Sequence, residues 1–467
     1  MISTLRYLTI AMVAFSTPLF ALSPEEETLV SGIEGLYRPD PVPFAPGTIA
    51  RPRSGSALLR EAFNRWNVLS SEARERLNPF MSLPDSGTAG SPSEAGSTWS
   101  VLETPHFKIH YRPTGSDSPA PQDANGNKIP DFVDNAGTYL EKVYQKEVGE
   151  MGFLPPPGDK QRIYLRKLQN NGLTHPLANQ ASWIELNTNI LGYTKEVLGS
   201  YYDPNKVSRD PDGVEAGLLK AVCAHEYFHS CQARYSWSQP DWWAEGTADW
   251  IGNQVFPESG FYLNNVGPHL EAPHVSLFAQ GDFYEYSASL FPTFLSESAS
   301  EGTALVRRVW ELCRSGTELT QALQQVAGDL PETFLLYASY NLLRNYKDGA
   351  RMPAPRIEKV DRFPASFSPT AGNEPQHYGA NFIRLTPSGN GTAKITVSPT
   401  GSHQLGVKLI AIDKESSSWT IVKTRPAGKE FLAQIPGVGD RVSEIFVVVA
   451  NFTPGAAASY RLTASIE

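Results

Sequence analysis

The sequence has few cysteines, no excess of basic residues and no long apolar run beyond its N-terminus. Lys and Arg total 40 against 49 Asp and Glu, which gives a net charge of −9. Without a basic run the chain offers no electrostatic surface for nucleic acid, so we expect no nucleic-acid partner. No later stretch approaches the ~18 apolar residues that a membrane span needs, so we expect no integral membrane segment in the mature protein.

The three cysteines are Cys223, Cys231 and Cys313. Cys223 and Cys231 lie eight residues apart on one predicted helix, which separates them by ~12 Å along the helix axis and places them beyond disulfide reach. The sequence therefore leaves two alternatives: one bridge that joins Cys313 to Cys231 or Cys223, or three buried free thiols.

The N-terminus is typical of a targeting segment. Arg6 is the only early charge, and residues 7–21 carry none, ending in a small residue, Ala21. This pattern predicts a signal peptide at 1–21 that is removed on export. We therefore expect a secreted, periplasmic or extracellular protein.

The rest of the chain divides by composition into three parts. Residues 22–98 form an N-terminal extension that ends in a Ser/Gly/Ala/Pro-rich linker, and this extension is either a propeptide or a packing arm. Residues 99–363 show strand patterns first and helical patterns later, which predicts an α+β domain. Residues 364–467 contain short β-branched runs between turn residues, which predicts a C-terminal all-β sandwich.

The pattern His225-Glu226-Tyr227-Phe228-His229 carries the clearest chemistry. On a helix, residues i and i+4 share a face, so His225 and His229 can offer two imidazole nitrogens to one zinc ion. Glu226 lies about 100° further around the helix, where it can act as a general base on water without binding the metal.

A second predicted helix supplies the remaining ligand. A catalytic zinc takes a third protein ligand and keeps an open position. Glu245 lies 16 residues after His229 and shares a helical face with Asp249. We expect Glu245 to bind zinc and Asp249 to accept a hydrogen bond from the far nitrogen of a ligating histidine, with His225 as the expected donor.

These two motifs resemble those of the gluzincin metallopeptidases, which include thermolysin-like proteases and zinc aminopeptidases. The resemblance implies a zincin-like catalytic domain with the same roles for the same residues. A wider similarity, over residues 100–385, is to a family of secreted bacterial metalloprotease-like proteins. It rests on the segments HFKIHY (106–111), DANGNKIPD (123–131), HEYFH (225–229), WWAEGTADW (242–250) and HYGANFIRL (377–385).

The aminopeptidase resemblance also implies an electrophilic tyrosine. Tyr286 matches that position in a Tyr-Ser-x-Gly-Ala stretch, although Ser289 stands where those enzymes have glycine, and Tyr284 is the spare candidate. The G-x-M-E-N exopeptidase sequence of the aminopeptidases is missing from the chain, which favours an endopeptidase. We expect the stretch 181–187 to be the edge strand that pairs with a peptide substrate.

An Asp/Asn-rich loop precedes the first long predicted helix. Its oxygen-bearing residues have the spacing of an EF-hand or dockerin calcium loop. Two departures are Lys128, at the position that glycine usually holds, and an aspartate in place of glutamate at the last position. The alternative is an Asx-rich turn that caps the helix. The candidate structural Ca²⁺ ligands are Asp123, Asn125, Asn127, Ile129 (through its carbonyl), Asp131 and Asp134.

Together these features predict a secreted zinc-dependent metallopeptidase with Glu226 as general base and Tyr286 as oxyanion donor. Its partner would be a peptide or protein substrate, and the C-terminal module would bind a surface or the substrate. Two alternatives stay open. One is a calcium-stabilised binding or adhesion protein on an inactive protease scaffold, and the other is a zinc hydrolase that acts on a non-peptide substrate.

Overall fold

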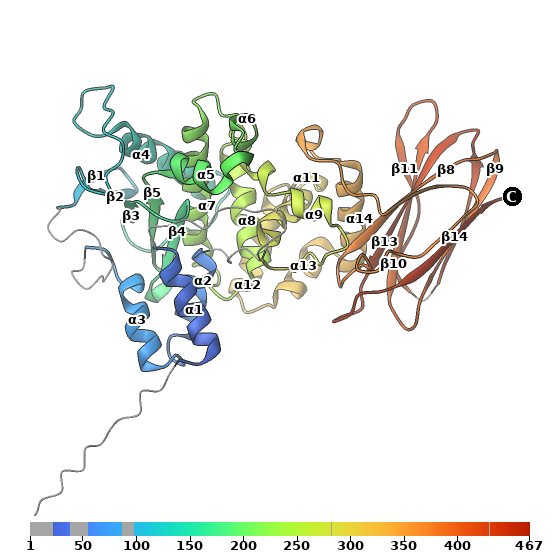
Figure 1. The fold of residues 1–467 in the computed structure, drawn as a ribbon, viewed down its shortest axis with the longest axis horizontal. Helices are drawn as coiled ribbons and strands as arrows, with labels where there is room; N and C mark the ends of the chain where they lie inside the picture. The colour runs from blue at the N-terminus through green and yellow to red at the C-terminus, as the bar shows by residue number, and fades with distance from the viewer. Residues whose placement is uncertain (1–21, 38–54, 86–97, 282, 429) are drawn as a thin grey trace, which may run out of the picture.

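The computed structural model shows a mixed α+β protein, as the sequence predicts, with two β-sheets among the residues that it describes. The N-terminal helices and the first sheet lie at one end of the longest axis, further helices occupy the middle, and the second sheet forms the other end (Figure 1). The predicted signal peptide, 1–21, lies outside the described residues. The structure describes residues 22–37, 55–85, 98–281, 283–428 and 430–467.

The first sheet has five strands in the order β1-β2-β3-β5-β4. The three inner strands run parallel, while β1 and β4 pair antiparallel with their neighbours at the two edges. The strands are β1 (Ser100–Glu103), β2 (Phe107–Tyr111), β3 (Gln161–Arg166), β4 (Gly172–Pro176) and β5 (Ser182–Asn187).

The predicted position of the free edge is wrong. The stretch expected to form the edge, 181–187, contains β5, which lies between β3 and β4 and is buried along its whole length. The edge strand is β4, which follows an Asn-Gly pair that suggests only a turn. A five-residue strand that begins with glycine and ends with proline carries almost no strand signal, since both residues are depleted in strands.

Helices cover one face of this sheet and form the middle of the molecule (Figure 1). The segment 284–298 forms two helices, Tyr284–Ser287 and Leu290–Ser298, which Ala288 and Ser289 separate. The helices of this part are α4 (Asp131–Tyr144), α5 (Ile190–Leu198), α6 (Pro204–Val207), α7 (Val214–Gln232), α8 (Asp241–Val255), α9 (Gly267–Glu271), α10 (Tyr284–Ser287), α11 (Leu290–Ser298), α12 (Ala304–Arg314), α13 (Leu319–Ala327) and α14 (Leu330–Leu343).

Helix α7 is the centre of the largest hydrophobic core. It packs against α4, α8 and the sheet, and it is buried on nearly every side. A helix that is apolar or buried all round belongs to the interior of a large domain rather than to its surface. Among the described residues, no helix is both long and apolar enough to cross a membrane.

The second sheet has nine strands and is nearly barrel-like. One half, with β10 and β13, faces the other, with β9 and β14, and the halves are linked between Val438 and Val442. A separate hydrophobic core fills the space between them. The strands are β6 (Lys359–Arg362), β7 (Ala365–Phe367), β8 (Ala380–Thr386), β9 (Gly391–Pro399), β10 (Leu405–Asp413), β11 (Trp419–Gly428), β12 (Phe431–Val438), β13 (Val442–Asn451) and β14 (Tyr460–Ile466).

The second sheet is attached firmly to the helices. Its first strand, β6, pairs with β8 and begins before the expected boundary at residue 364. Ile410, Val448 and Phe452 pack into the main core rather than the sheet's own core. The two parts therefore share apolar surface, and we expect them to unfold together.

The three cysteines are buried free thiols. Of the two alternatives that the sequence leaves, the bridge from Cys313 to Cys231 or Cys223 is not formed, and three buried free thiols are what the structure shows. The Sγ of Cys231 lies instead 3.8 Å from Oε2 of Glu147, a fully buried carboxyl on the turn that follows α4. Burial raises the pKa of Glu147 well above its ordinary value, which favours its neutral form.

The described residues before the first sheet, 22–37 and 55–85, form three helices, and we call them the N-terminal arm. The helices are α1 (Pro24–Gly35), α2 (Gly55–Arg65) and α3 (Ser71–Met81), and α1 begins with a Ser23–Glu26 capping box. They pack around a core of their own, to which the other described residues contribute only Leu168 and Leu173. The arm is thus a small helical unit that rests on the sheet.

A buried ion-pair network joins the arm to the outer face of the sheet. Glu185 accepts hydrogen bonds from Arg166 (2.6 Å) and from Tyr37 of the arm (2.7 Å), and it lies 3.0 Å from His175. Burial acts to raise the pKa of Glu185, but the charges of Arg166 and His175 outweigh it and lower the pKa to about 2.

We expect this network to make the free energy of unfolding depend on pH in the acidic range. Glu185 has a folded-state pKa of about 2 against an ordinary value of 4.5, so its contribution is complete above pH 4.5 and is lost as the pH falls towards 2. The free energy of unfolding is measured in urea for wild type and Glu185→Gln, at pH 6 and at pH 2. The difference between the two proteins should change by about 3 kcal/mol between these pH values. A pH-independent difference would contradict this assignment.

Candidate metal centre

Helices α7 and α8 bring together the residues that the sequence selects as zinc ligands. His225 and His229 lie one turn apart on α7, and Glu245 lies on α8, which packs against it. Within the described part of the chain, these three are the one set of His, Cys, Asp or Glu side chains whose ligand atoms converge closely enough to hold a metal ion.

The spacing of the three ligand atoms fits zinc. The Nε2 atoms of His225 and His229 are 3.1 Å apart, and each lies 3.3 Å from Oε2 of Glu245. Tetrahedral zinc with bonds of roughly 2.0–2.1 Å separates neighbouring ligand atoms by about 3.3–3.4 Å. The triangle is therefore the right size for one zinc ion, with a fourth position left for water or substrate.

Each histidine is oriented from behind by another side chain. Nδ1 of His225 lies 2.9 Å from Oδ1 of Asp249, the contact that the sequence predicts. Nδ1 of His229 lies 2.9 Å from Oε1 of Gln232, whose amide in turn donates to the Ala244 carbonyl. Sequence reasoning missed Gln232, whose one signal is its position a single turn after His229. These contacts fix the rings with Nε2 facing the centre.

The electrostatics of the centre favour a cation. Burial acts to lower the pKa of His225, but its hydrogen bonds with Asp249 and Glu245 outweigh burial and raise the pKa well above the ordinary value. Burial likewise acts to raise the pKa of Glu245, but the charge of His229 and the other cationic groups around it hold that pKa well below its usual range. A divalent ion would satisfy the same carboxylates.

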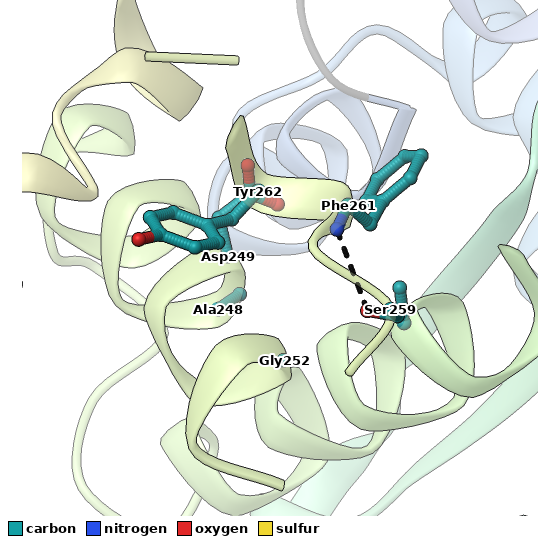
Figure 2. Close-up of a pocket in the computed structure, with 7 residues that line it drawn as sticks. Ala248, Asp249, Gly252, Ser259, Phe261 and Tyr262 are labelled. Atoms are coloured by element: carbon teal, nitrogen blue, oxygen red, sulfur yellow. Dashed lines mark hydrogen bonds between the residues drawn. The ribbon is translucent and has the colours of Figure 1, made fainter. Parts of the chain in front are cut away.

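A small pocket lies behind Asp249, and Figure 2 shows Ala248, Asp249 and Gly252 of α8 facing Ser259, Phe261 and Tyr262. Asn265 also donates to the second oxygen of Asp249. None of the three candidate ligands lines this pocket, so the pocket is separate from the ligand triangle.

Glu226 lies beside the edge strand β4. Its Oε2 accepts from Thr174 Oγ1 at 2.7 Å and from Ser56 Oγ at 3.1 Å, and the side chain is almost fully buried. A Cβ at Gly172 would lie 2.7 Å from Cγ of Glu226, so only glycine lets β4 come this close to α7. The sequence gives no signal for Ser56 or Thr174, because both contacts are made across long separations in the chain.

Tyr286 lies at the rim of the centre. Its ring centroid is 5.9 Å from that of His225, and the side chain is partly buried. A Cβ at Gly246 would lie 3.0 Å from the Ala288 carbonyl carbon, so glycine allows α8 to pack closely against the end of α10. The spare candidate, Tyr284, instead lies against the buried ring of His269.

Arg60 of the arm also reaches the centre. Its Nη1 lies 3.2 Å from Oε1 of Glu245, and its Nη2 donates to Asp241 at 2.8 Å. Arg60 is 4% exposed and Glu245 is fully buried. A cation of the N-terminal arm thus contacts the predicted glutamate ligand, a contact that sequence reasoning missed.

The candidate calcium loop is exposed and held by its own hydrogen bonds. Oδ1 of Asp123 accepts from the backbone N–H groups of Gly126 and Asn127, and the amides of Asn125 and Asn127 both donate to Asp134. Lys128 adopts φ +70°, the left-handed conformation that glycine usually supplies at this position of such loops. Asp131 accepts from the backbone of Ala124. The ligand atoms of Asp123, Asp131 and Asp134 do not converge as those of His225, His229 and Glu245 do, and calcium binding stays a prediction.

Comparisons with known proteins leave the family open. No family model matches the chain, and the search of curated proteins found no match to it. The pre-peptidase C-terminal domain of a Bacillus anthracis collagenase is 9% identical, with 24% of this chain and 100% of that one covered and a TM-score of 0.19. The Yersinia pseudotuberculosis-derived mitogen is 15% identical, with 22% and 88% covered and a TM-score of 0.18. The Aeromonas hydrophila lysozyme inhibitor PliG is 14% identical, with 24% and 98% covered and a TM-score of 0.16.

Proposed function

We propose that this protein is an exported zinc-dependent metallopeptidase of the gluzincin type, with a zincin-like catalytic domain. The observation that carries the proposal is the ligand triangle of His225, His229 and Glu245, with sides of 3.1–3.3 Å. Glu226 directly follows His225 on the same helix. Zinc held there would supply Lewis acidity at an open fourth position.

The chain's own residues would do the proton transfer and the positioning. Glu226 would accept a proton from the attacking water and deliver it to the leaving amine. The Tyr286 hydroxyl would donate a hydrogen bond to the oxyanion that forms on the scissile carbonyl. The free edge of β4 would pair with an extended peptide, which favours an endopeptidase because a strand edge selects no chain terminus.

Casein hydrolysis with zinc analysis on the same sample tests the proposal. Both wild type and Arg60→Glu should be assayed. In wild type Arg60 contacts the candidate ligand Glu245, and its positive charge opposes a metal cation there. Hydrolysis that stops on chelation and returns with zinc is the expected result. A protein with one zinc per chain that cleaves neither casein nor a peptide library would overturn peptidase action, and would favour a non-peptide substrate or a binding role.

Replacing Tyr286 by Phe tests the oxyanion role. We expect kcat to fall about a hundredfold with little change in KM, because the hydroxyl would act mainly on the transition state. Tyr284→Phe is the matched control, since it removes the same hydroxyl on the same short helix. Equal effects of the two substitutions would remove Tyr286 from the mechanism.

A further inference from the structure

Helix α2 of the N-terminal arm lies along the free edge of β4, at the place where a peptide substrate would pair. The backbone N–H of Thr174 donates to Ser56 Oγ at 3.0 Å. A free strand edge offers such N–H groups to the carbonyl oxygens of an added strand. Ser56 therefore takes the hydrogen bond that a substrate carbonyl would accept.

The same helix engages both functional carboxylates. Ser56 donates to Oε2 of Glu226, and Arg60 pairs with Oε1 of Glu245 and with Asp241. Ser56 and Arg60 are 3% and 4% exposed. With Ser56 and Thr174 both directed at Oε2 of Glu226, that oxygen is not available to water, and the positive charge of Arg60 opposes a metal cation nearby.

The arm is also built in a way that permits its departure. Among the described residues, its hydrophobic core takes only Leu168 and Leu173 from the catalytic part and otherwise consists of the arm's own side chains. Beneath Tyr37 the sheet presents Glu185 and Arg166, charged groups that tolerate water.

From these contacts we propose that the N-terminal arm keeps the enzyme latent by seating α2 in the substrate position, with Ser56 and Arg60 as the latch. The proposal rests on the proposed peptidase function, because the blocked position is the peptide-binding edge. Activation requires that α2 leave β4, which frees the Thr174 N–H for substrate and removes the Ser56 hydroxyl from Oε2 of Glu226.

The test compares Arg60→Glu with Arg65→Glu in the full-length protein. The first places a carboxylate against Asp241 and Glu245, while the second makes the same change on the same helix at a half-exposed residue that pairs with Glu61 and Glu25. Three quantities are measured on zinc-loaded protein: casein hydrolysis, affinity for a non-cleavable peptide hydroxamate, and hydrogen exchange of residues 172–176.

We expect Arg60→Glu to bind the hydroxamate and cleave casein at least about tenfold better than wild type, with faster exchange at β4, and Arg65→Glu to match wild type. Ser56→Ala, which removes a single hydroxyl and keeps the fold, should shift all three readouts the same way by about threefold.

The readouts separate the latch from the catalysis. Tighter hydroxamate binding and faster exchange without any cleavage would support the latch and overturn the peptidase function. The latch would be overturned if hydroxamate affinity and hydrogen exchange at β4 were the same in wild type, Ser56→Ala and Arg60→Glu. This outcome does not depend on which reaction the centre performs. An equal gain in Arg65→Glu would overturn the specific role of Arg60.

Discussion

Glu226→Gln is expected to reduce peptide hydrolysis about a thousandfold while leaving one zinc per chain. General acid–base catalysis by a positioned side chain contributes roughly 10²–10⁴-fold, and here one carboxylate would serve both the attacking water and the leaving amine. Gln has the same size as Glu and keeps an oxygen for Ser56 and Thr174, whose contacts with Glu226 hold the side chain in place. The loss should therefore appear in kcat and not in stability.

The comparison should be made in the Arg60→Glu background as well as in the wild-type sequence, so that the arm does not mask the effect. Metal content and melting temperature are measured on the same samples. Hydrolysis that persists at more than about a tenth of the parent rate would remove Glu226 as the general base, because a missing base costs at least about a hundredfold. Loss of zinc along with the activity would instead make Glu226 part of the metal site.

The parts of this centre that the sequence predicts are those that lie close together along one helix or two consecutive helices. His225 and His229 share a face because the period of the helix is fixed, and Asp249 meets His225 because α8 packs directly against α7. The same reasoning gives the mixed α+β class, since strand and helix patterns differ in period.

Residues that reach the centre from far along the chain were not predictable. Ser56 meets Glu226 across 170 positions, and Arg60 meets Asp241 across 181. Neither residue belongs to a motif. Their helix, α2, packs against β4, a strand whose sequence carries little strand signal. Only tertiary packing places them, and for that reason the extension suggested either a propeptide or a packing arm.

His229→Ala should abolish the response of the protein to zinc. A ligand that binds only the folded state at a thousand times its Kd adds about 4 kcal/mol to the free energy of unfolding, and wild type should show this as a higher melting temperature in added zinc. His229 is fully buried and its Nε2 forms one corner of the ligand triangle. Without it two ligands are left, too few for a catalytic zinc site.

Removing a buried histidine also costs stability for reasons unrelated to metal, so the control is His269→Ala. His269 is buried beside Tyr284, outside the ligand triangle. Burial lowers the pKa of His269 to about 4, so it is a neutral packing residue at the pH of the assay. Both variants should melt lower than wild type, but only His269→Ala should regain stability when zinc is added. If His229→Ala responds to zinc as His269→Ala does, then zinc binds elsewhere, and the peptidase proposal loses the observation that carries it.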